Sequence, residues 1–151
     1  MHLVLCRSNA IGSWFIRAMT LGRWSHSAIL DTEEGEVYDT SFLHGGCKIW
    51  NSTTFFARYK EFRKIELQVE DLSSARIWLN NQLGKPYDWT ATLALSGITG
   101  VVNLIFGRNW QRDDKWFCSE HTETFITRFS RPRFRTDALS RVTPKHQDML
   151  A

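Results

Sequence analysis

The sequence predicts a single α+β domain, residues 1–151, in which helices pack against an antiparallel sheet. Between residues 25 and 69, short runs of alternating apolar residues are separated by turn residues, as in strands joined by hairpins. From Asp71 onward, apolar residues recur every three or four positions, as along one face of a helix. Seven tryptophans and 42% hydrophobic residues indicate a packed core and exclude a disordered chain.

The first part of the chain predicts a strand and then a helix. Residues 3–6 are an apolar run typical of a buried strand. Ser8 and Asn9 can cap a helix that ends near Gly22. The apolar residues of this helix are spaced to form one buried face: Ile11, Trp14, Phe15, Ala18 and Met19.

Four more strands follow in the prediction. Residues 25–30 and 35–40 are two of them, and the polar loop between them predicts a hairpin. Residues 47–50 and 62–69 are the others.

The second half of the chain predicts helices. Residues 71–83 form a helical stripe that ends before Gly84, and residues 90–106 form a second helical region. A polar loop leads to a helix that starts near Cys118 and buries Phe125 and Phe129. Residues 142–145 predict a turn before a frayed terminus.

Charge and cysteine content say little about the partner and the cellular compartment of the protein. A net charge of +3 suits an anionic partner without requiring one. Three widely spaced cysteines do not make a disulfide framework, so we expect a reducing compartment. No secretion signal is evident at the N-terminus. Residues 89–107 carry no charge, but polar residues and glycines interrupt them, so a buried or surface-grazing helix with lipid contact through residues 90–106 is expected.

Cys118 is the first candidate for chemistry. A thiol in the first turn of a helix lies near unpaired backbone N–H groups and the positive end of the helix dipole. Both favour the thiolate, which is the nucleophilic form. The alternative is a buried structural cysteine. A nucleophilic role requires, in addition, a histidine that can act as base.

His26 and Asp39 are the candidate partners of Cys118. His26 lies in a predicted strand, on the same face as Ala28 and Leu30, where a polar residue breaks the pattern. If the predicted hairpin forms, Asp39 lies beside His26 and can fix its tautomer. His121, three residues after Cys118, is a less suitable base because the helix fixes both side-chain directions.

Four motifs resemble the circularly permuted NlpC-type hydrolases, a papain-like group that includes YiiX-like proteins and, more distantly, lecithin–retinol acyltransferase. They are RWSHSAI at 23–29, VYD at 37–39, GKPYD at 84–88 and FCSE at 117–120. In this permuted group the histidine strand precedes the cysteine, as it does here. The resemblance implies Cys118 as nucleophile, His26 as base and no metal or cofactor. Asp39 matches a position where many relatives carry glutamate or another polar residue. Tyr87 matches a tyrosine near the active site of relatives, and it either donates to the oxyanion or packs its ring at a helix entry.

The resemblance also implies a substrate class. It favours a cysteine hydrolase of amide or peptide bonds in bacterial cell-wall peptidoglycan. The alternative on the same fold is a hydrolase or acyltransferase of lipid acyl esters or thioesters. Short proteins with this pattern resemble ones from phage genomes, so we expect cytoplasmic synthesis followed by delivery with a phage tail or lysis components.

Three other interpretations remain open from the residues alone. His44, Cys47, Cys118 and His121 are the ligand types of a structural zinc site, although their spacing matches no zinc knuckle. The arginine-rich residues 128–141 suit phosphate or single-stranded bases, but a solvated face is more usual, and no specific nucleic acid is expected. A structural or binding protein without catalysis is the third.

Overall fold

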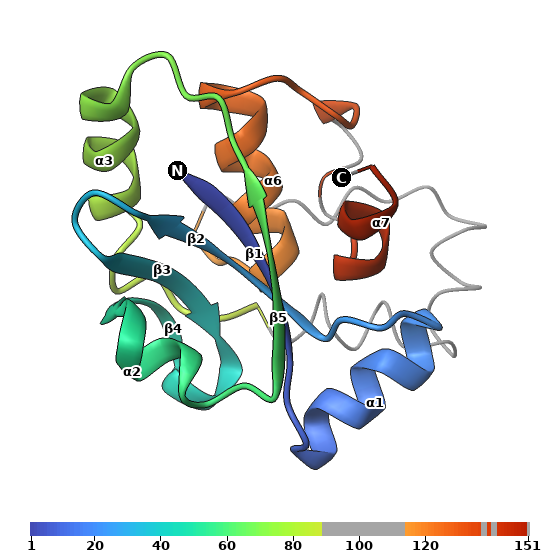
Figure 1. Ribbon diagram of the computed structural model, residues 1–151. Coiled ribbons are helices and arrows are strands. Elements are labelled where there is room, and N and C mark those ends of the chain that lie inside the picture. Colours follow the sequence, from blue (N-terminus) through green and yellow to red (C-terminus); the bar gives the residue numbers. More distant parts are fainter. Residues whose placement is uncertain (89–113, 137–138, 140–141, 151) are drawn as a thin grey trace.

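The computed structural model describes residues 1–88, 114–136, 139 and 142–150 (Figure 1). Within these residues an antiparallel sheet of five strands has the order β4-β3-β2-β1-β5. The predicted α+β class is therefore confirmed. The strands are β1 (His2–Arg7), β2 (His26–Asp31), β3 (Glu36–Ser41), β4 (Gly46–Asn51) and β5 (Glu61–Glu66). The helices are α1 (Ile11–Thr20), the 3₁₀ helix η1 (Phe42–His44), α2 (Ser52–Phe56), α3 (Leu72–Asn80), α6 (Cys118–Phe129) and α7 (Pro144–Met149).

The hairpin of β2 and β3 has the predicted pairing. Ala28 lies opposite Asp39 in the ladder. His26 lies two residues before Ala28 and therefore points to the same face of the sheet as Ala28 and Asp39. The register thus brings the two polar side chains together at the end of β2.

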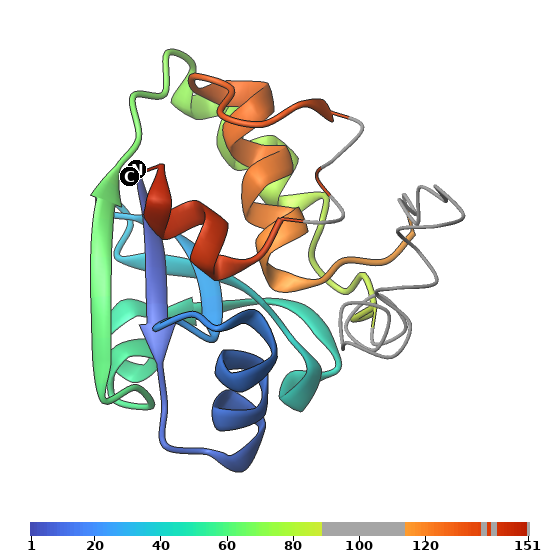
Figure 2. The ribbon, with the colours of Figure 1, turned by 90° about the vertical axis from the view of Figure 1, so that its right-hand side faces the viewer.

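Apolar side chains form a core on each face of the sheet. One face packs against α3 and α6 through residues such as Leu5, Ile29 and Phe125. The other face packs against α2, where Phe55 is fully buried. Figure 2 shows α6 standing beside the sheet, with α7 next to it. His26 and Asp39 lie on the face of the sheet that packs against α2. Cys118 lies at the start of α6, which packs on the opposite face.

Helix α1 is present and ends near Gly22 as predicted, but its predicted N-cap is wrong, and Ile11, Trp14 and Ala18 of its predicted buried face are exposed. Ala10 stands at the N-cap, and Leu21, in the left-handed conformation at φ 50°, ends the helix. Ile11 and Trp14 are 87% and 64% exposed. Ser13 faces inward, and its Oγ lies 2.6 Å from Oγ of Ser25 in a buried hydrogen bond that holds the rotation of the helix.

Other boundaries also differ from the prediction. Strand β5 ends at Glu66, so the predicted strand over 62–69 is too long. The predicted frayed terminus is wrong, because Pro144 begins α7 and Thr143 caps it in a reciprocal arrangement with His146. The predicted helical region and lipid contact at 90–106 lie outside the described residues. Within the described part of the chain, none of the helices has the length and apolarity needed to cross a membrane.

Candidate active site

Cys118 is the first residue of α6, as predicted. Phe117 precedes it at the N-cap and makes no side-chain hydrogen bond to the helix. The first backbone N–H groups of α6 therefore lack helical partners, and the positive end of the helix dipole lies at the thiol. Cys118 is only 6% exposed, and the His26 side chain and the backbone of Ser27 lie close enough to its sulfur to lower the pKa of the thiol.

His26 joins the thiol to a buried carboxylate. Its Nε2 lies 2.5 Å from Oδ1 of Asp39, whose side chain is 1% exposed. Burial alone would raise the pKa of Asp39, but the charge and hydrogen bond of His26 lower it below the ordinary value. The ionised Asp39 only accepts, so Nε2 of His26 donates to it. The other ring nitrogen, Nδ1, is then the one left for Cys118.

Arg58 and Tyr59 complete the surroundings of this pair, and no pattern in the sequence predicts either of them. The Nη2 atom of Arg58 lies 3.6 Å from Oδ2 of Asp39. The ring of Tyr59 stacks on His26 with centroids 5.9 Å apart and an interplanar angle of 5°. Arg58 also donates to Nε2 of His44 at 2.6 Å. Because arginine is always charged, His44 accepts as a neutral ring, and burial and the nearby guanidinium lower its pKa.

The pKa values of Cys118 and His26 move in opposite directions. Burial opposes a thiolate, but the hydrogen bond and charge of His26 outweigh it and lower the pKa of Cys118. Burial likewise opposes an imidazolium, but Tyr59, Asp39 and the bond to Cys118 raise the pKa of His26 well above its ordinary value. Both shifts favour a thiolate–imidazolium pair over the neutral thiol and imidazole.

The other two cysteines behave differently. Burial raises the pKa of Cys6 to about 12 and that of Cys47 to about 11. Both side chains are free and buried. Cys118 thus differs from the other two, whose raised pKa values are typical of inert structural cysteines.

No protein-family model, curated protein or solved structure matches this chain. What the site can do therefore follows from its own residues. A thiolate, an imidazole within hydrogen-bond reach and a carboxylate on the far ring nitrogen are the parts that covalent acyl transfer requires.

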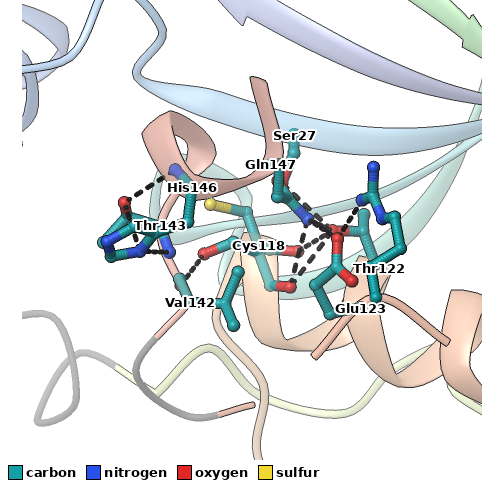
Figure 3. Close-up of polar contacts among 10 residues, drawn as sticks. Ser27, Cys118, Thr122, Glu123, Val142, Thr143, His146 and Gln147 are labelled. Atoms are coloured by element: carbon teal, nitrogen blue, oxygen red, sulfur yellow. Dashed lines mark hydrogen bonds and ion pairs between the residues drawn. The ribbon is translucent and has the colours of Figure 1, made fainter. Parts of the chain in front are cut away.

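Helix α7 contacts the first turns of α6, which carry Cys118, through hydrogen bonds of Gln147 (Figure 3). Gln147, which is fully buried, donates to Oγ1 of Thr122 at 2.7 Å and to Oε1 of Glu123 at 2.9 Å. Thr122 in turn donates to the carbonyl of Cys118 at 3.1 Å, and Ser119 Oγ donates to the carbonyl of Val142 at 2.6 Å. These bonds fix the helical turn that carries Cys118.

Tyr87 lies beside the segment that leads into Cys118. Its backbone pairs with Trp116 in a parallel bridge. Its ring meets Phe42 edge-on, with centroids 6.0 Å apart. Tyr87 is thus paired with a residue only two positions before Cys118. The role of its hydroxyl stays a prediction.

The four zinc candidates do not form a metal site. Among the residues that the structure describes, no three His, Cys, Asp or Glu side chains gather as a metal ion requires. His121 is fully buried, bonds to Thr40 through Nδ1 at 3.1 Å and stacks on Trp78. Burial lowers the pKa of His121 to about 4, so it is a neutral core residue.

One arginine of the basic segment has an internal role. Arg133 forms an ion pair with the buried carboxylate of Glu123, and its side chain is 14% exposed. Arg133 is therefore not available to a phosphate, which weakens the nucleic-acid interpretation.

Proposed function

We propose that this chain is a cysteine hydrolase of the papain-like, permuted NlpC type, with Cys118 as nucleophile and His26 as base. The observation that supports it most is the position of His26, whose Nε2 bonds to Asp39 and whose charge and hydrogen bonding lower the pKa of Cys118. Structural cysteines seldom combine a helix start, a lowered pKa and a histidine held by a carboxylate.

In the proposed first step, the Cys118 thiolate attacks the carbonyl carbon of an amide or ester. The carbon–sulfur bond forms as the carbonyl electrons move onto oxygen. When the tetrahedral species collapses, Nδ1–H of His26 gives its proton to the leaving amine or alcohol, and an acyl-enzyme remains. Asp39 keeps the proton of Nε2 and stabilises the imidazolium without taking that proton.

In the second step, water releases the acyl group. Neutral His26 takes a proton from the water, whose oxygen attacks the thioester carbon. Collapse expels the Cys118 thiolate and yields a carboxylic acid, which restores the starting thiolate–imidazolium pair. We assign the backbone N–H of Cys118, at the start of α6, and the hydroxyl of Tyr87 as the two donors to the oxyanion.

For the substrate, we propose an amide or peptide bond in peptidoglycan, on the basis of the motif resemblance and the net charge of +3. Delivery with a phage tail or lysis apparatus belongs to the same proposal. A lipid acyl ester or thioester is the second candidate. It is favoured by the exposed apolar side chains of η1, since Phe42 is 67% and Leu43 79% exposed and Phe42 contacts Tyr87.

Two parallel incubations test these proposals. Purified protein and its Cys118→Ala variant are mixed with purified peptidoglycan and, separately, with acyl esters and thioesters. We expect the wild type alone to release new amino groups or stem peptides from peptidoglycan, detected by mass spectrometry. Release only from esters or thioesters would favour the second candidate. Equal results for wild type and Cys118→Ala on all substrates would reject catalysis.

A further inference from the structure

The outward face of α1 is apolar. Ile11 is 87% and Trp14 64% exposed, and Ala18 is exposed on the same face one turn further along. Residues at positions i, i+3 and i+7 lie on one side of a helix. Leu21, which ends the helix, is 82% exposed. A helix of a globular protein normally turns such a face inward, so α1 is inverted.

Polar contacts hold α1 in this orientation. Ser13 is buried, bonds to Ser25 at 2.6 Å and accepts from the backbone N–H of Ser8 at 3.3 Å. Arg17 folds back along the helix and donates through Nε to the carbonyl of Ser13 at 3.3 Å. The apolar face therefore cannot turn inward without the loss of a buried hydrogen bond.

Positive charges gather at the C-terminal end of this apolar face. Residues 11–20 include no aspartate or glutamate, and Arg17 lies in the last turn. Arg23 follows shortly after and has a 63% exposed side chain. Lys145 lies beside Gly22 at the end of the helix. The neighbouring carboxylate of Glu61 is shared between Arg7 and Arg23 at 3.4 and 3.2 Å, so it neutralises only part of this charge.

We propose that the apolar face of α1 docks onto a membrane surface that contains anionic lipid. An apolar helix face with cationic residues at its border is the pattern of interfacial helices. The indole of Trp14 suits the headgroup level, because its ring is apolar and its N–H is polar.

Charge also argues against a second copy of the chain as the occupant. In a symmetric dimer the same patch meets itself, so the cationic borders of the two copies would lie close together and repel. An anionic lipid surface instead attracts this border. Because Ser25 directly precedes His26, docking through α1 brings the end of the sheet that carries the candidate site toward the lipid (Figure 1). The proposal does not depend on catalysis.

Vesicle flotation of the full chain tests this proposal. The vesicles consist of phosphatidylcholine alone or of an equimolar mixture with phosphatidylglycerol, each at low and high salt. We expect wild type to bind the mixed vesicles, to bind less at high salt, and to bind pure phosphatidylcholine weakly. Ile11→Glu should weaken binding to mixed vesicles by about tenfold or more, because the apolar contact is lost and a negative charge is added.

Ile77→Glu is the matched control, because Ile77 is also an exposed isoleucine on a helix, 62% exposed on α3. It should bind as wild type, and circular dichroism checks that both variants fold. Absence of wild-type binding to mixed vesicles would overturn the proposal, as would equal binding by Ile11→Glu. Self-association of wild type that Ile11→Glu abolishes, measured by sedimentation equilibrium, would assign the face to a second copy instead.

Discussion

Nε2 of His26 lies 2.5 Å from Oδ1 of Asp39, and the other carboxylate oxygen faces Arg58 at 3.6 Å. The carboxylate thus holds a histidine with one oxygen and meets a cation with the other. This arrangement fixes the tautomer of His26 and directs its remaining nitrogen to Cys118. Three of the five predictions below replace one member of this chain of contacts.

Asp39→Asn should slow alkylation of Cys118 at pH 7 by about tenfold or more. The neutral amide no longer stabilises an imidazolium, so burial lowers the pKa of His26, and each unit of pKa corresponds to a factor of ten. Iodoacetamide kinetics with peptide mapping measure the rate. Asp31→Asn is the control, because Asp31 is also a buried strand aspartate but pairs with Arg76 at 2.6 Å. Equal rates in the two variants would contradict the role of Asp39.

Hairpin pairing explains why much of this site was predictable. The loop residues 31–35 specify a hairpin, and the alternation of β2 and β3 specifies which residues share a face. His26 and Asp39 therefore had to be neighbours once the strands paired. The helix start at Cys118 followed in the same way from the apolar period of α6.

Arg58 and Tyr59 were not predictable, because they follow a helix of only five residues, which has no periodic pattern to detect. The orientation of α1 was missed for a different reason. Its spacing predicts an apolar face correctly, but spacing does not say whether that face turns inward. The buried bond between Ser13 and Ser25 decides the rotation, and it joins residues of separate elements.

Arg58→Met should move the acid limit of stability to higher pH. Asp39 has a lowered pKa in the folded protein, so its stabilisation is present above the pKa of the unfolded carboxyl and is lost as pH falls through the folded value. Removal of the guanidinium raises the folded pKa, and acid unfolding then begins earlier. Fluorescence-detected unfolding against pH measures this shift.

Arg76→Met provides the comparison for Arg58→Met, since it breaks the ion pair with Asp31 on the same sheet. It should lower stability but leave the alkylation rate of Cys118 unchanged. Arg58→Met should lower both quantities. An acid limit that stays in place in Arg58→Met would show that Arg58 does not hold the Asp39 charge.

Cys118 should be the first cysteine to react as pH rises. Its pKa is lowered, whereas those of Cys6 and Cys47 are raised to about 12 and about 11. Alkylation of Cys118 should therefore be extensive well below the ordinary thiol pKa of about 8.5. Peptide mapping after iodoacetamide treatment across pH identifies the modified residue. Earlier modification of Cys6 or Cys47 in folded protein would refute the assignment.

His26→Ala should slow alkylation of Cys118 at pH 7 by about tenfold or more. The hydrogen bond and charge of His26 are the main causes that offset burial of the Cys118 sulfur, so their loss raises the pKa of the thiol. His121→Ala serves as the comparison, because His121 is a neutral residue bonded to Thr40. The rate per folded molecule should change little in His121→Ala. A comparable loss in both variants would point to general loosening of α6 as the cause.

Gln147→Leu should destabilise the fold by about 1–3 kcal/mol, the usual cost of leaving buried polar groups without a partner. The substitution keeps the volume of the side chain but removes its donors to Thr122 and Glu123. The Glu123 carboxyl already has a pKa raised by burial, so it tolerates the loss of a donor poorly. Urea unfolding measures the change, and Gln68→Leu on the exposed surface should alter the free energy of unfolding by less than about 0.5 kcal/mol.

Because Thr122 donates to the carbonyl of Cys118, Gln147→Leu should also slow alkylation of Cys118 in the folded protein. A destabilised variant with an unchanged alkylation rate would show that α7 supports the fold but not the thiol.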